Sequence, residues 1–191
     1  MKIKVEVSAR HVHLSNSDME VLFGKGYVLS HKKELSQPGQ FACEERVEIE
    51  GSKGKISGVI VLAPCRAKTQ VELSITDCIK LGIKPVVRES GDLSGSSGCK
   101  IIGPNGVVDI EEGVIVAHRH VHMNVEEAKI LGVKDGQIGK IRINSEYRSL
   151  IFEDVVIRVN QNYSLAMHID TDEANAAGLT QGILGEFLCC K

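Results

Sequence analysis

One short segment occurs twice in the chain and constrains what it can fold into. Arg10-His-Val-His-Leu-Ser15 near the N-terminus is matched by Arg119-His-Val-His-Met-Asn124 in the second half. Histidines two residues apart on a β-strand point to the same face of the sheet, and neutral imidazole is the commonest metal ligand. The repeat therefore predicts two strands that each present a pair of metal-binding side chains.

A longer pattern surrounds these segments and occurs four times. Each copy combines a strand, a capping residue, an acidic residue three positions later, a short helix and a glycine; the capping residues are Ser15, Ser74, Asn124 and Asp170. A capping side chain followed three residues later by an acid is a variant of the capping box. We therefore expect four short helices in an internally repeated fold.

Strands are expected to make up most of the remaining structure. Alternating or apolar runs between Gly and Pro breaks predict strands at 2–7, 27–30, 41–50, 55–62, 69–73, 85–88, 100–102, 107–110, 138–143, 150–159, 165–169 and 185–189. Residues 31–40 are expected to form a polar loop, and a turn at Asn105-Gly106 predicts a hairpin. The predicted fold class is mainly β (α+β).

The repeat also selects candidate metal ligands. A metal-capable side chain stands two residues before every capping residue, and in two copies a second histidine stands two residues further back, where the other copies have Gln70 and Ala166. This gives two sets of three: His11, His13 and Glu72, and His120, His122 and His168. Two histidines with a carboxylate, or three histidines, leave an open coordination position, which is typical of catalytic zinc.

The alternative for any one of these histidines is a half-buried structural role on a strand, and it is the joint pattern that favours a metal. His118 shares strand parity with His120 and His122. Three alternate histidines on one strand rarely all reach one ion, so we expect His118 to be a bystander or to support a ligand. His31 lies in the predicted polar loop and is expected to be solvated.

Two further features suit an anion. Arg66 follows Ala63-Pro64-Cys65 at the end of a strand, and its planar guanidinium suits phosphate or carboxylate, although an exposed salt-bridging arginine is the alternative. The loop Ser90–Gly98 could offer backbone N–H groups to an anion or be a flexible connector. The residues alone therefore predict a one- or two-zinc site for an anionic substrate.

Composition excludes several other classes. The 191 residues carry a net charge of −2, only 4% are aromatic and Trp is absent, so neither a basic nucleic-acid surface nor a base-stacking platform is expected. No apolar run approaches the ~20 residues that cross a bilayer, and no signal-peptide pattern is seen. Six cysteines without a C-x-x-C pair predict reduced thiols in a cytoplasmic protein.

Several long segments resemble a known family almost from end to end. They are Arg10–Ser15, Leu35-Ser-Gln-Pro-Gly-Gln-Phe41, Thr69-Gln-Val-Glu-Leu-Ser74, Glu89-Ser-Gly-Asp-Leu93, Arg119–Met123 and Met167–Gly178. They closely resemble the PduL-type phosphate acyltransferases (phosphotransacylases), which comprise the phosphate propanoyltransferases of 1,2-propanediol degradation and their acetyl-preferring relatives. The resemblance implies the reversible reaction of acyl-CoA (propanoyl-CoA or acetyl-CoA) with phosphate to give acyl phosphate and CoA.

The resemblance also implies a site. It implies two β-barrel domains capped by short α-helices, with the active site and two zinc ions between the barrels. The family's zinc ligands fall on the six residues that the repeat selected, its catalytic, phosphate-binding arginine falls on Arg66, and its CoA contacts fall near Ser8, Lys33 and Asn175. We expect zinc and Arg66 to hold phosphate against the thioester carbonyl, with no protein nucleophile.

The family's domain division is discontinuous. Here it implies one barrel from 1–9 with 118–191 and a second from 10–117. The predicted partners are acyl-CoA, phosphate and acyl phosphate, together with further copies of the chain in a homo-oligomer. The resemblance also implies association with a microcompartment. Microcompartment members often carry an N-terminal targeting helix, whereas this sequence begins directly at a predicted strand, so this targeting route is not expected. The rival functions are a binuclear zinc hydrolase and a non-catalytic metal-binding scaffold protein.

Overall fold

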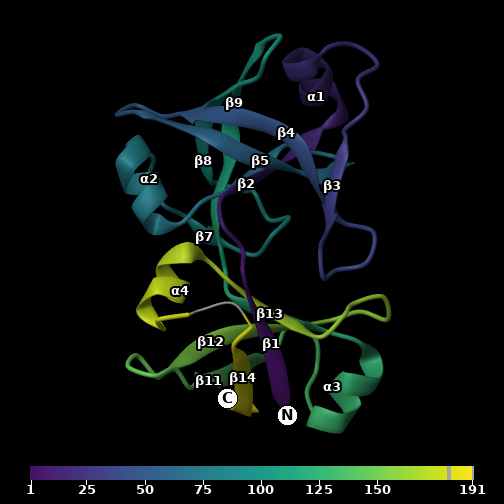
Figure 1. The fold of residues 1–191 in the computed structure, drawn as a ribbon, viewed down its shortest axis with the longest axis vertical. Helices are drawn as coiled ribbons and strands as arrows, with labels where there is room; N and C mark the ends of the chain where they lie inside the picture. Colours follow the sequence, from purple (N-terminus) through teal and green to yellow (C-terminus); the bar gives the residue numbers. More distant parts are fainter. Residues whose placement is uncertain (180–181, 191) are drawn as a thin grey trace. The chain divides into compact units, whose positions relative to one another are not determined.

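The computed structural model describes residues 1–179 and 182–190 and is mainly β, with four short helices in this part of the chain (Figure 1). The fold class predicted from the sequence is confirmed. Two compact units are present: Met1–Ser8, Ser36–Pro38 and His118–Lys191 form the first, and Ala9–Leu35 and Gly39–Ala117 form the second. The predicted domain division, 1–9 with 118–191 and 10–117 by itself, stays a prediction.

In the second unit six strands pair in a closed ring. Neighbours around the ring are, in order, β4 (Phe41–Glu50), β5 (Lys55–Arg66), β2 (His11–Ser15), β6 (Gln70–Glu72), β9 (Val107–Ala117) and β8 (Ser97–Ile102), which pairs with β4 again. Two short strands extend it, since β3 (His31–Glu34) pairs with β4 and β7 (Val87–Arg88) pairs with β9. Helices α1 (Asn16–Phe23) and α2 (Ile75–Leu81) follow β2 and β6.

The first unit closes in the same way. Its ring runs through β1 (Lys2–Val7), β13 (Ala166–Ile169), β10 (His120–Met123), β12 (Leu150–Val159), β11 (Ile138–Ile143) and β14 (Leu184–Cys190), which pairs with β1. Helices α3 (Val125–Leu131) and α4 (Thr171–Ala176) follow β10 and β13. Each unit has its own apolar core, with Val12 and Val71 in one and Val121 and Met167 in the other.

The two rings share one pairing scheme. In each, a strand with two histidines pairs parallel with one neighbour and antiparallel with a short strand that carries the third candidate ligand: β2 lies between β5 and β6, and β10 between β12 and β13. The short strand then pairs in parallel with β9 in one ring and with β1 in the other. β1 therefore takes the place in its ring that β9 takes in the other, although β1 precedes β2 and β9 precedes β10 along the chain.

All four predicted caps are confirmed. The side chains of Ser15, Ser74, Asn124 and Asp170 each accept a hydrogen bond from the backbone N–H three residues later. At α3 and α4 the acid in that position, Glu127 or Glu173, also reaches back to the N–H of the capping residue. The corresponding aspartates are one methylene shorter and bind elsewhere, Asp18 to the Thr69 hydroxyl and Asp77 to Arg10 Nε.

The predicted course of residues 27–34 was wrong, whereas residues 35–40 form no helix or strand, as predicted. Residues 27–30 form no strand, because the Ser30 N–H and the Tyr27 hydroxyl donate to the Glu45 carboxylate. The expected polar loop instead contains β3, whose exposed residues His31 to Glu34 pair with β4. An exposed edge strand has no apolar face, so its sequence carries no alternating signal. The strand expected at 85–88 shortens to Val87–Arg88, whereas β5 and β9 run further than predicted.

Two expectations from composition concern the whole chain. All six cysteines lie within the described residues and none of them forms a disulfide. No helix within residues 1–179 and 182–190 is long and apolar enough to span a membrane.

Candidate metal centre

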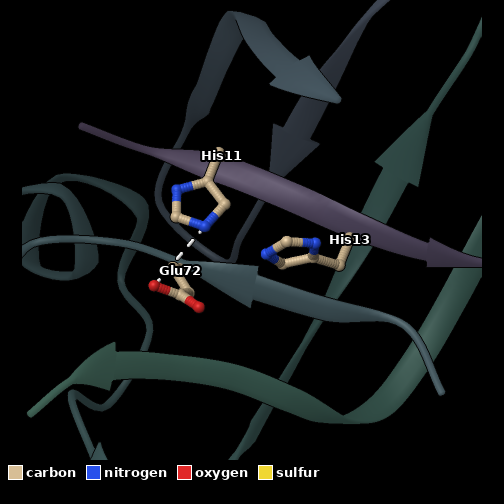
Figure 2. Close-up of side chains that lie close together, drawn as sticks. All are labelled: His11, His13 and Glu72. Atoms are coloured by element: carbon tan, nitrogen blue, oxygen red, sulfur yellow. Dashed lines mark ion pairs between the residues drawn. The ribbon is translucent and has the colours of Figure 1, made fainter. Parts of the chain in front are cut away.

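The first predicted ligand set comes together on two neighbouring strands. His11 and His13 lie on β2 and Glu72 lies on β6, where it stands directly opposite His11 in the antiparallel ladder. All three residues are buried, with 4%, 3% and 9% of their surface exposed. Figure 2 shows their side chains turned toward one another, and one potential ligand atom from each lies within 4.8 Å of the others.

Hydrogen bonds hold His11 in one orientation. Its Nδ1 lies 2.9 Å from the carbonyl oxygen of Ala9. A carbonyl oxygen only accepts, so Nδ1 carries a proton, and in the neutral ring Nε2 is then the nitrogen with a lone pair. This Nε2 lies 3.4 Å from Glu72 Oε2. His11 therefore presents the nitrogen that a metal ion would need toward the carboxylate.

Arg66, the predicted anion contact, borders this set. It is the last residue of β5, and its Nη2 donates to His13 Nε2 at 2.8 Å. Its Nη1 donates to the Ser90 hydroxyl at 3.1 Å. Neither contact is the exposed salt bridge of the alternative, since the guanidinium of Arg66 donates to the buried candidate ligand His13 and to the Ser90 hydroxyl.

Gln70 and Ser90 also belong to this cluster, although the sequence patterns did not predict them as site residues. Gln70 Nε2 donates to Glu72 Oε1 at 2.6 Å and to Ser90 Oγ at 2.9 Å, while its own oxygen accepts from the Gly91 N–H. Ser90 Oγ donates to Glu72 Oε1 at 3.0 Å. The sequence held a signal for both, because Gln70 occupies a repeat position that carries histidine elsewhere and Ser90 begins the candidate anion loop.

The residues of this cluster shift one another's pKa values. Burial and the nearby charges of His11 and Arg66 lower the pKa of His13 to about 2, so its imidazole is neutral. Burial opposes ionisation of Glu72, but the charge and hydrogen bond of His11 outweigh it and the pKa of Glu72 falls below its usual range. Burial also opposes protonation of His11, yet Glu72 and the Ala9 carbonyl raise its pKa. Neutral His13 and ionised Glu72 are in the forms that bind metal ions.

The second predicted set also gathers, though less tightly. His120 and His122 lie on β10 and His168 lies opposite His120 on β13. The three ring centroids are 4.6 to 5.3 Å apart. Among residues 1–179 and 182–190, only the first set has three metal-capable atoms within 4.8 Å of one another.

The orientation of His120 repeats that of His11. Its Nδ1 lies 2.7 Å from the carbonyl oxygen of His118, again two residues earlier. The ring of His118 itself contacts the carbonyl oxygen of Arg119 through Nδ1 at 3.2 Å. His118 thus contacts a candidate ligand through its backbone carbonyl oxygen, and the role of its side chain stays a prediction.

The residues expected near CoA make local contacts. The Ser8 N–H donates to the carbonyl oxygen of Ile169, and the carbonyl oxygen of Asn175 accepts from Arg148 Nη1. Lys33 is exposed on β3 in the other unit. CoA binding by these three residues stays a prediction. His31 is exposed as expected and pairs with Glu34 at 2.7 Å.

Comparison with known proteins places these residues in a family context. A family model described as phosphate propanoyltransferase matches residues 4–180. A phosphate propanoyltransferase of Sebaldella termitidis is 56% identical over 181 residues, covering 95% of this chain and 85% of the relative. One of Thermotoga maritima is 56% identical over 182 residues, covering 95% and 87%, and one of Listeria monocytogenes is 47% identical over 186 residues, covering 97% and 87%.

Proposed function

The chain belongs to the phosphate propanoyltransferase family, and we propose that each of its two ligand sets holds a zinc ion and that Arg66 binds phosphate in this reaction. The protein is an acyltransferase that moves an acyl group between CoA and phosphate. In the forward direction a phosphate oxygen attacks the thioester carbonyl, the carbon–sulfur bond breaks, and CoA leaves as a thiol after taking a proton.

One observation carries the zinc proposal: three buried candidate ligands converge within 4.8 Å beside an arginine. Zinc binds histidine nitrogen and carboxylate oxygen at about 2.0–2.2 Å in a tetrahedral arrangement, so its ligand atoms lie within about 3.5 Å of one another. The cluster needs only small side-chain adjustments to reach that geometry. The donor set and its protonation state also fit zinc, and we propose that a second ion is held by His120, His122 and His168.

Zinc held by Nε2 of His11 and His13 and by a Glu72 oxygen would supply a Lewis acid for charge that develops on oxygen. Gln70 and Ser90 occupy Oε1 of Glu72, which leaves Oε2 on the side of His11. The carboxylate is thus fixed with one oxygen directed at the other two ligands. This division of the two oxygens is the contribution of Gln70 and Ser90 to the site.

Arg66 supplies the anion contact in this proposal. His13 Nε2 accepts from Arg66 in this structure and cannot hold an ion with the same lone pair. A zinc ion at His13 would take this lone pair from Arg66 Nη2, and the planar guanidinium would match two oxygens of a phosphate. Positioning the phosphate in this way converts a bimolecular attack into a local one.

The substrate is proposed from the family name and the chemistry together. We propose propanoyl-CoA as acyl donor, with acetyl-CoA as the alternative donor. Participation in 1,2-propanediol degradation, a homo-oligomeric state and association with a microcompartment stay predictions. The rival functions, a binuclear zinc hydrolase and a non-catalytic scaffold, use the same metal-binding residues and differ in what they do with phosphate.

Phosphate-dependent thiol release from propanoyl-CoA distinguishes the three functions. The acyltransferase is expected to release CoA only when phosphate is present and to form an equal amount of acyl phosphate. A hydrolase would release CoA without phosphate, and a scaffold would release none. Chelator treatment should abolish release and added zinc should restore it. Activity that persists in protein shown to be metal-free would contradict zinc dependence.

A further inference from the structure

A carboxylate lies beside the all-histidine set. In the parallel pairing of β1 with β13, Glu6 is the direct partner of His168. The Oε2 atom of Glu6 lies 4.0 Å from Nδ1 of His168. Both residues belong to the same unit, and Glu6 was not among the candidate residues selected from the sequence.

Neighbouring side chains hold this carboxylate in place. Lys4 Nζ lies 2.6 Å from Oε1 of Glu6, and the Ser36 hydroxyl donates to Oε2 at 2.5 Å. Lys4 is on the same strand, whereas Ser36 comes from the short segment Ser36–Pro38 that belongs to this unit. A side chain tethered through both oxygens has little freedom to turn away from His168.

The corresponding position in the other ring has no charge. There the third candidate ligand is Glu72, and its direct partner in the parallel pairing of β6 with β9 is the fully buried Ile115. Each set of three therefore has one carboxylate, either as a candidate ligand (Glu72) or next to one (Glu6). Three neutral imidazoles leave a zinc ion with its full double charge, and a neighbouring carboxylate offsets part of it.

We propose, building on the zinc centre proposed above, that Glu6 is a positioning residue for His168. Its carboxylate faces Nδ1 of His168, so that Nε2 is directed toward the ion. Nδ1 of His11 and Nδ1 of His120 face carbonyl oxygens in the same sense. A histidine that binds a metal almost always gives its other N–H to a carboxylate or carbonyl, and losing that partner typically costs 10- to 100-fold in metal affinity.

The test is a comparison of zinc affinity at the two sites in the full-length protein. Glu6→Gln keeps the shape of the side chain and removes its charge, and His168→Ala identifies the zinc that belongs to the all-histidine set. Zinc is measured by competition with a chromophoric chelator, and cobalt substitution reports the site through its visible absorption. Glu50→Gln is the matched control, because Glu50 also pairs with a lysine, at 2.9 Å from Lys55, in the other unit.

We expect Glu6→Gln to weaken the zinc that His168→Ala removes by about 10- to 100-fold and to alter its cobalt spectrum. The other zinc and the urea unfolding midpoint of the metal-free protein should match those of Glu50→Gln. Ser36→Ala, which retains the charge, should give a smaller loss. Wild-type affinity and an unchanged spectrum in Glu6→Gln would overturn the role of Glu6 alone. A wild-type protein with no zinc sensitive to His168→Ala would overturn the second zinc site and this inference with it.

Discussion

At the residue scale, substitution of Arg66 tests phosphate binding separately from metal binding. A hydrogen bond to a charged partner contributes roughly 1.5–3 kcal/mol, and about 1.4 kcal/mol corresponds to a tenfold change. Arg66→Gln is therefore expected to lower kcat/KM for phosphate by roughly 10- to 100-fold, and Arg66→Lys should recover part of this because it keeps the charge without the planar fork. The measurement is steady-state kinetics with phosphate varied at saturating propanoyl-CoA.

Metal content provides the control for Arg66. The side chain contacts His13 without being a candidate ligand, so zinc content should remain at the wild-type value in both variants. A variant that loses zinc in parallel with activity would show that Arg66 is structural. Unchanged phosphate dependence would move the phosphate site elsewhere, with the loop that begins at Ser90 the next place to examine.

The two ligand sets make a second residue-scale prediction. Wild-type protein purified without chelator should contain close to two zinc ions per chain. Glu72→Gln should weaken one of them, because a neutral amide is a poorer ligand than a carboxylate, and should leave the all-histidine set loaded. His122→Ala should remove the other ion and abolish turnover. Elemental analysis with activity measurements tests this, and a near-normal rate in His122→Ala would show that its set is not catalytic.

At the element scale, the caps explain how short helices end the ligand-bearing strands. At α3 the Asn124 side chain accepts from the Glu127 N–H at 2.9 Å, and the Glu127 carboxylate accepts from the Asn124 N–H at 2.8 Å. Asn124 lies two residues after His122, so the cap fixes where β10 stops and the chain turns away. The helices thus position the ligand strands without contributing a ligand themselves.

The capping contact is expected to contribute measurably to the free energy of unfolding. Asn124→Ala should lower the free energy of unfolding of the metal-free protein by about 1 kcal/mol, because a backbone donor loses its partner. The matched control is Asn144→Ala at an exposed position outside helices and strands, where we expect a change within about 0.5 kcal/mol. Urea unfolding followed by circular dichroism measures both. Equal effects in the two variants would show that the cap does not stabilise α3.

At the scale of the whole molecule, the first strand determines which pieces can fold. Residues 10–117 contain all six strands of their ring, whereas 118–191 lack β1, which pairs with both β13 and β14. Without β1 the ring is open and two strands expose unpaired edges. One predicted domain is therefore a continuous segment, whereas the other is complete only with the N-terminal strand, even though the two rings are built alike.

This asymmetry can be tested with fragments. We expect residues 10–117 to unfold cooperatively in isolation and residues 118–191 not to. Joining residues 1–9 to the end of 118–191 through a short Gly-Ser linker should restore cooperative unfolding, since the Phe187 N–H already donates to the Met1 carbonyl oxygen. Urea unfolding and amide hydrogen exchange measure the outcome. Cooperative unfolding of 118–191 alone would contradict the discontinuous domain.

The amino-acid sequence by itself determined the local features. Spacing of two along a strand places both histidines of a pair on one face, and the capping residues mark where α1 to α4 begin, because both depend only on neighbours in the chain. The four-fold repeat even grouped Glu72 with His11 and His13, which the structure brings within 4.8 Å. The edge strand β3 had no such signal, since its exposed residues show no periodicity.

Only the tertiary structure decided which distant segments meet. Strand β1 alternates in the same way whichever ring it joins, so its pairing with β13, and the approach of Glu6 to His168, followed from ring closure rather than from any local pattern. The contacts of Ser90 with Gln70 and Glu72 likewise depend on a loop folding back 18 to 20 residues along the chain. Such contacts are set by the packing of the whole ring, and short-range sequence patterns contain no information about it.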